Sequence, residues 1–279
     1  MIKCLNILLY SNIYIACCAV AMTLQTILLL QLNQAWLLPL VGLVFCATLI
    51  VYALHRLISL SKISSNLGGT RFEQIALYQN SLKLLLIVAL LFAAAFAYFL
   101  SPGVHLILVP AAFISFAYVL PFIGKHKKRL RDIAYLKIFL IAFVWSFVTV
   151  ALPIINAEQI FGRQEFLMLM ERFLFIFTIT LPFDIRDIAI DNSNAVRTIP
   201  TLIGTNATLK LGYFSLFGWL TLVLFIYGIT LFVPFFLTAS ICFFLLRKST
   251  IHQHDYFFTA GVDGLMLIQF LLVYGWLLT

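Results

Sequence analysis

The sequence predicts an all-α membrane protein with nine transmembrane helices. Three observations support this: the composition, the length of the apolar runs and the placement of the charges. Of the 279 residues, 63% are hydrophobic and 10% are charged, and the mean hydropathy is +1.09. A soluble globular domain carries about 25% charged residues. Apolar runs of about 18 or more residues, each long enough to cross a bilayer as a helix, recur along the chain. No segment is typical of a separate soluble domain, so residues 1–279 are predicted to form one polytopic membrane domain.

The apolar runs place the helices in order. We predict them at residues 5–30, 36–54, 80–100, 103–122, 133–155, 166–183, 208–228, 231–246 and 257–278. The first run is similar to a signal peptide. However, Asn6, Ser11 and Asn12 interrupt its apolar core and no good cleavage site follows, so we expect this helix to be retained.

The connections between these helices alternate in charge. Those after the second, fourth, sixth and eighth helices are polar and basic. Those after the first, third and seventh contain no Lys or Arg, and the one after the fifth contains only Arg163. The positive-inside rule then predicts a cytoplasmic N-terminus and an external C-terminus. The protein would be a multi-pass integral membrane protein, located in the plasma or inner membrane if the source is prokaryotic.

The net charge of +8 does not indicate nucleic-acid binding. The basic residues lie in short loops between spans, and no solvated basic domain is available to hold a duplex. The five cysteines have neither metal-ligand nor disulfide spacing, so we interpret them as small packing residues.

One short stretch concentrates acidic residues in this apolar chain. "LPFDIRDIAIDNSNAVRTIPTLIG" (181–204) places Asp184, Asp187 and Asp191 at i, i+3 and i+7, which lie on one face of a helix. Three neighbouring carboxylates repel one another unless a cation joins them, and Mg²⁺ suits carboxylates together with substrate phosphates. Arg186 and Arg197 are near enough in sequence to contact such a phosphate. On spacing alone, a solvated loop whose acids pair with these arginines remains an alternative.

The residues after the aspartates add to this interpretation. "DIRDIAID" followed by "RTIPTLIG" resembles the second aspartate-rich motif of the UbiA superfamily of intramembrane prenyltransferases, through Asp184, Asp187, Asp191, Arg197, Thr198, Ile199, Pro200 and Gly204. "FAYVLPFIGKHKKRLRD" (116–132) is similar to the family's Tyr…Pro…Lys segment. Nine helices is also the family's number, so the resemblance covers nearly the whole chain.

The resemblance implies a fold and a reaction. The fold would be a UbiA-like bundle around a central cavity, in which Mg²⁺ holds the diphosphate of a polyprenyl donor. The polyprenyl group would pass to an aromatic or lipid acceptor in the membrane. Asp184, Asp187 and Asp191 would be the catalytic metal ligands, and Arg56, Lys125, Arg186 and Arg197 would surround the diphosphate.

The chain departs from the family at the first aspartate-rich motif. "LIVYALHRLISLSK" (49–62) stands where that motif is expected, and no Asp or Glu precedes Glu73. In one account His55 and Arg56 contact the diphosphate, so that fixed positive charge replaces one Mg²⁺. In the other, the protein is a catalytically degenerate component that binds a prenyl lipid or phospholipid without turnover. A transporter is a weaker alternative, because we find no convincing internal repeats or broken spans.

Two further charged residues are candidates for the substrate site. Asp263 lies inside the last predicted helix, and an ionisable residue in a span usually faces a cavity or a partner. Lys83 would be such a partner, or would extend to the membrane interface. Arg71 precedes the third predicted helix, where the resemblance implies a basic residue for the diphosphate.

Overall fold

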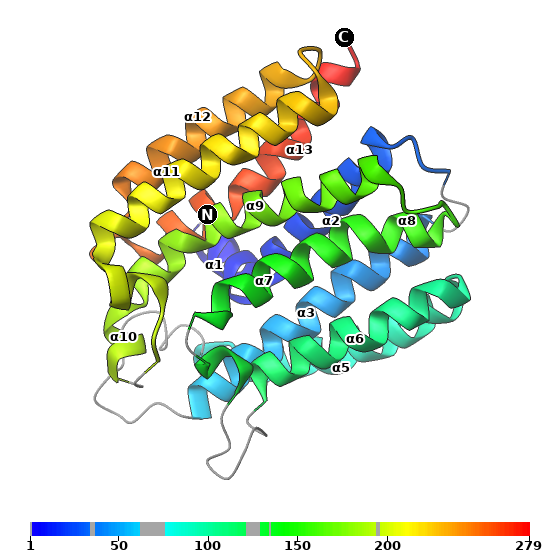
Figure 1. Cartoon of the computed structure of the whole chain (residues 1–279). Coiled ribbons are helices and arrows are strands. Elements are labelled where there is room, and N and C mark those ends of the chain that lie inside the picture. Colours follow the sequence, from blue (N-terminus) through cyan, green and yellow to red (C-terminus); the bar gives the residue numbers. More distant parts are fainter. Residues whose placement is uncertain (1, 34–36, 62–75, 121–128, 134, 194–195) are drawn as a thin grey trace.

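The computed structural model describes residues 2–33, 37–61, 76–120, 129–133, 135–193 and 196–279. The regular secondary structure of these residues is helical, with no β-strand among them (Figure 1). The α-helices are α1 (Ile2–Tyr10), α2 (Ile13–Leu29), α3 (Leu37–Ser61), α5 (Gln79–Tyr98), α6 (Pro102–Val119), α7 (Leu136–Ser146), α8 (Leu152–Asn156), α9 (Arg163–Arg186), α10 (Ile188–Ser193), α11 (Ile199–Tyr227), α12 (Phe232–Lys248) and α13 (Gly264–Leu277).

Two π-helical segments extend this set. Phe147–Ala151 joins α7 to α8, so that Leu136–Asn156 is one continuous helix of 21 residues. Phe257–Val262 precedes α13, and together they give a second continuous helix of 21 residues, Phe257–Leu277.

The all-α membrane fold is confirmed. Within the described residues, seven helices are long and apolar enough to cross a membrane, and Ile13–Leu29 is a shorter apolar helix. Helix α12 has 17 residues. At a rise of about 1.5 Å per residue, a helix of this length covers somewhat less than the hydrocarbon core of a bilayer. The number of nine spans and the orientation of the termini stay predictions.

Local signals explain where the helices differ from the predicted ranges. The first predicted helix is divided into α1 and α2 at Asn12, which has φ 70°, a left-handed conformation that Asn tolerates better than most residues. Helix α11 begins earlier than predicted, because Thr198 and Thr201 cap it reciprocally and Pro200 stands in its first turn. The helix then kinks at Gly204, whose φ of 80° is a backbone conformation that other residues rarely adopt.

The helices pack around a common interior (Figure 1). From α2, neighbouring helices pack in the order α3, α6, α7, α9, α11, α12 and α13, and α13 returns to α2. Helix α5 packs on α3. Helix α9 contributes Phe175, Ile176 and Ile179 to the largest buried apolar cluster, which also contains residues of α2, α7, α11, α12 and α13.

A buried charged pair ties four elements together. Glu171 and Arg172 of α9 are both 0% exposed. The Trp219 indole of α11 donates a hydrogen bond to Glu171, and Arg172 Nη1 donates to the Met22 carbonyl of α2 at 2.9 Å and to Thr149 Oγ1 at 3.0 Å. Arg172 Nε and Glu171 Oε2, which lie 3.9 Å apart, make no hydrogen bond, so the three hydrogen bonds above tie the pair in α9 to its neighbours.

Candidate functional site

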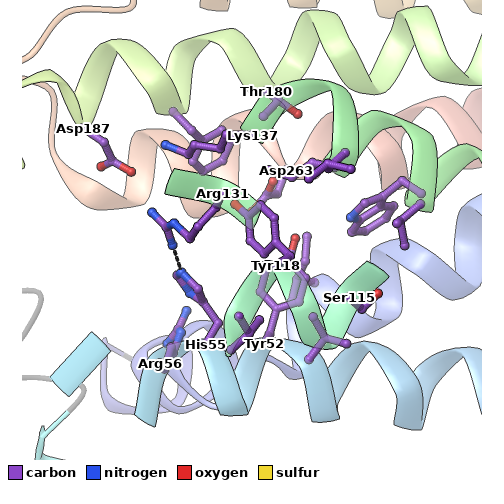
Figure 2. Close-up of a pocket in the computed structure, with 18 of the residues that line it drawn as sticks. Tyr52, His55, Arg56, Ser115, Tyr118, Arg131, Lys137, Thr180, Asp187 and Asp263 are labelled. Carbon is purple, nitrogen blue, oxygen red and sulfur yellow. Dashed lines mark hydrogen bonds between the residues drawn. The ribbon is translucent and has the colours of Figure 1, made fainter. Parts of the chain in front are cut away.

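A cavity lies at the end of the bundle where α9 is followed by α10. It has about 210 Å³ of space for water-sized molecules, and residues of α1, α2, α3, α6, α7, α9 and the Phe257–Leu277 helix line it. Figure 2 shows charged side chains at one end, among them Asp187, Lys137, Arg131 and Arg56, together with the His55 imidazole. Toward the other end, side chains such as Tyr52, Tyr118 and Ser115 line the cavity.

The first and third aspartates meet at one lysine. Lys137 Nζ lies 2.8 Å from Asp184 Oδ1 and 3.4 Å from Asp191 Oδ2. The three residues come from α7, α9 and α10, and their side chains are 7%, 1% and 4% exposed. Burial raises the pKa of the Asp191 carboxyl from its usual value, and the positive charge of Lys137 opposes that rise. Two acids that are separated along the sequence therefore share one buried cation.

The second aspartate has a different partner. Asp187 ends α9, because the chain leaves the helix there before α10 begins. Arg186 binds both its oxygens, with Nε 2.8 Å from Oδ1 and Nη2 3.3 Å from Oδ2. Arg186 Nη1 also donates to Asp255 Oδ1 at 3.0 Å. Asp184 and Asp187 both line the cavity, while Asp191 reaches it through Lys137. The predicted trio thus forms two ion-paired groups, with Asp184 and Asp191 on Lys137 and Asp187 on Arg186.

The basic side of the cavity contains His55, Arg56 and Arg131. The Arg131 guanidinium contacts His55 Nε2, and its Cζ lies 5.6 Å from the centroid of the Tyr118 ring (Figure 2). Arg56 donates hydrogen bonds to the carbonyls of Leu9 and Tyr10 at the end of α1, at 3.1 Å and 2.6 Å. Arg131 is therefore held by the His55 imidazole and the face of the Tyr118 ring. Arg56 stabilises the C-terminal end of α1.

Asp263 lies among the residues that line the cavity, between the π-helical segment and α13. Its side chain is drawn near those of Tyr52 and Tyr118 in Figure 2. Lys83, the partner considered from the sequence, is exposed on α5 and is not among the cavity residues. Further along the wall, Trp145 and the aliphatic side chains Ile141 and Val144 make the surface mainly apolar.

One predicted site residue is not brought to the cavity, and two others cannot be placed because they lie outside the described residues. Arg197 has an exposed side chain and is not among the lining residues, because the chain runs extended before α11. Its carbonyl accepts a hydrogen bond from the Tyr135 amide at 2.9 Å, which places its backbone beside the start of α7. Arg71 and Lys125 lie outside the described residues.

Sequence reasoning missed Lys137, Arg131 and Asp255. Lys137 is a single lysine inside an apolar span, which is a signal for function because a charge is expensive there. Arg131 belongs to the basic stretch 124–132, where binding to lipid headgroups is an equally good interpretation. No sequence signal distinguishes Asp255, which reaches the site only through the packing of the last helix beside α9.

The donor set suits a divalent cation held jointly with a ligand. Asp184 Oδ1 is buried and accepts no hydrogen bond, although the Lys137 ammonium lies beside it. Among the described residues, no group of three or more His, Cys, Asp or Glu side chains is gathered to hold a metal ion. Mg²⁺ typically takes one or two carboxylates and completes its shell with water and substrate phosphates. Asp184 and Asp191 fit that number.

Three comparisons place this geometry among known proteins. No protein-family model matches the chain, and no curated protein is significantly similar to it in sequence. Solved structures do match. A UbiA homologue from Aeropyrum pernix K1 has a TM-score of 0.69 at 14% identity, over 96% of each chain. A UbiA homologue from Archaeoglobus fulgidus bound to GPP and Mg²⁺ has a TM-score of 0.61 at 11% identity, over 98% of this chain and 99% of the homologue.

A structure of digeranylgeranylglyceryl phosphate synthase is also similar, with a TM-score of 0.59 at 14% identity over 100% of both chains. These likenesses extend over the whole bundle and not over a part of it. The chain therefore has the fold of the UbiA homologues, as the aspartate-rich motif at 184–191 predicts.

Proposed function

We propose that this protein is a Mg²⁺-dependent prenyltransferase, which moves a polyprenyl group from its diphosphate to an acceptor in the membrane. The observation that carries the proposal is the division of one cavity into an end rich in charged side chains and a mainly aromatic and apolar remainder, in which Asp263 is the acidic residue. A prenyl diphosphate is divided in the same way, since an anionic head is joined to an apolar chain.

The charged end would bind the diphosphate. Arg131 and Lys137 both line the cavity, and Arg guanidinium groups match phosphate oxygens in geometry. Asp184 and Asp191 would hold Mg²⁺, and Asp187 would be the third acidic residue at the metal site. The ion would supply a positive charge that neutralises the departing diphosphate.

The remaining wall would receive the prenyl chain. Tyr52, Tyr118 and Trp145 present aromatic rings to the cavity, and such rings attract a cation. These rings would therefore stabilise a developing positive charge on the allylic carbon. The apolar residues would keep water from that carbon.

The structural neighbours support a prenyl diphosphate as the ligand. The Archaeoglobus fulgidus homologue is bound to GPP and Mg²⁺ in one structure and to DMAPP and Mg²⁺ in another. The protein is a multi-pass integral membrane protein, and we propose that the charged end of the cavity faces the cytoplasm, as the basic loops predict.

One observation favours a second function. The stretch 49–62 contains no acidic residue, and His55 and Arg56 stand there instead. A protein that binds a prenyl lipid or phospholipid without turnover would need cations at this position and no second metal. In that case the substitution Asp187→Asn would leave cellular function intact.

The test is consumption of polyprenyl diphosphates by the purified protein. Wild type should consume at least one chain length when Mg²⁺ and an acceptor are present, and Asp187→Asn should abolish this. Glu158→Gln is the matched control, because Glu158 is exposed in the connection between α8 and α9, remote from the cavity. If wild type consumes no member of a panel of chain lengths with any acceptor offered, catalysis is ruled out and the binding function remains.

A further inference from the structure

Lys137 occupies the point between two carboxylates at which a divalent cation would be bound. Its ammonium lies 2.8 Å from Asp184 Oδ1 and 3.4 Å from Asp191 Oδ2, and all three side chains are buried. The two acids are seven residues apart, on either side of the single residue that separates α9 from α10, whereas Lys137 comes from α7. A cation between them is needed, since two buried carboxylates without one would repel each other strongly.

The lysine and a divalent ion exclude each other at this position. Both need the same carboxylate oxygens, and Asp184 Oδ1 accepts no other hydrogen bond that would keep it engaged. The remaining aspartate of the motif is already bound by Arg186 through two hydrogen bonds. Each acid of the motif is thus paired with a basic side chain of the protein itself.

A diphosphate would change this balance. Lys137 lines the same cavity as Arg131 and His55, and lysine has a flexible four-carbon stem with a compact charge at its end. When a diphosphate enters, its oxygens offer the ammonium a second anionic partner. The carboxylates are then available to a divalent ion, whose remaining positions suit phosphate oxygens.

We propose that Lys137 is a tethered competitor of the divalent cation, which holds the Asp184–Asp191 pair until a diphosphate arrives and then turns to the diphosphate. The inference rests on the proposed function and adds a regulation of its site: metal and diphosphate bind as a coupled pair. By linkage, each ligand then raises the affinity of the site for the other by the same factor.

The test uses Mn²⁺ as the probe and requires no turnover. Protein-bound Mn²⁺ is measured by electron paramagnetic resonance on the purified full chain, with and without inorganic pyrophosphate. Lys137→Met should bind Mn²⁺ alone about 10- to 100-fold more tightly than wild type, because a charge-assisted contact no longer has to be broken. Lys83→Met is the control, since Lys83 is exposed on α5, and it should match wild type.

Wild type alone provides a second reading if Lys137→Met does not fold. The wild-type protein should bind Mn²⁺ weakly when pyrophosphate is absent and much more tightly when pyrophosphate is present. Equal Mn²⁺ affinity in wild type and Lys137→Met would overturn the proposal, and so would wild-type binding that pyrophosphate leaves unchanged. A protein that shows the coupling but consumes no prenyl diphosphate would retain this inference while losing the proposed activity.

Discussion

The substitution Arg131→Gln tests whether the basic side of the cavity binds the diphosphate. Arg131 precedes α7 and lines the cavity, and its guanidinium is held between His55 and the Tyr118 ring. Since the group is already positioned, little ordering is needed when it meets an anion. Glutamine keeps a polar side chain of similar reach but removes the charge.

The size of the effect follows from the charged hydrogen bonds that the guanidinium would donate to the diphosphate. A hydrogen bond to a charged group contributes about 1.5–3 kcal/mol. Each 1.4 kcal/mol is a factor of ten in Kd, so the variant should bind a prenyl diphosphate about 10- to 100-fold more weakly. Arg131→Lys should lie between the two, because lysine keeps the charge and lacks the planar fork.

The assay is isothermal titration calorimetry of GPP into purified protein at a fixed Mg²⁺ concentration. The matched control is Arg129→Gln, which removes an equal charge from the same basic stretch at a residue that does not line the cavity. Long-range attraction alone would make the two variants equally weak. A GPP affinity of Arg131→Gln within twofold of wild type, or an equal reduction in Arg129→Gln, would refute the reasoning.

Two further predictions concern the stability of the bundle in detergent, measured by thermal or chemical unfolding. Arg172→Met should lower the free energy of unfolding by about 3–5 kcal/mol, because it leaves Glu171 buried without its charged partner. In the Arg172→Met background, Glu171→Gln should lower the free energy of unfolding much less than it does in wild type. Equal effects of Glu171→Gln in the two backgrounds would contradict the pairing. Gly42→Ala should cost about 1–3 kcal/mol, because a Cβ there would lie 2.5–2.7 Å from atoms of the Phe96 ring. Gly275→Ala, where nothing lies within 4 Å, should be neutral, and equal stability of the two alanine variants would count against the packing of α3 on α5.

Much of the fold could be predicted from the sequence, because a bilayer demands long apolar helices and little else competes with that demand. The predicted span 80–100 is α5 (Gln79–Tyr98), and 257–278 is the helix Phe257–Leu277. The predicted helix boundaries are wrong where polar residues form part of a helix. The apolar run alone predicts a start at 208, because the polar residues Thr205 and Asn206 interrupt the apolar pattern before it. The helix start signals at Thr198 and Pro200 lie upstream of that interruption, and α11 begins there.

The site was predictable only in part, for a related reason. The motif at 184–191 identifies an acidic site, but one-face spacing presumes an unbroken helix, and the chain leaves α9 after Arg186 without a Gly or Pro to indicate it. The partners of the acids lie far along the chain. Lys137 is 54 residues from Asp191 and Asp255 is 69 residues from Arg186, so their meeting depends on helix packing that no local pattern records.

The most direct test of the account is native mass spectrometry after incubation with a panel of prenyl diphosphates and Mg²⁺. If the acidic end of the cavity exists to bind an isoprenoid diphosphate, wild type should retain about one such molecule per chain, and Asp184→Asn should retain none. Retention of no prenyl diphosphate by wild type, or equal retention by the Asp184→Asn variant, would contradict the account.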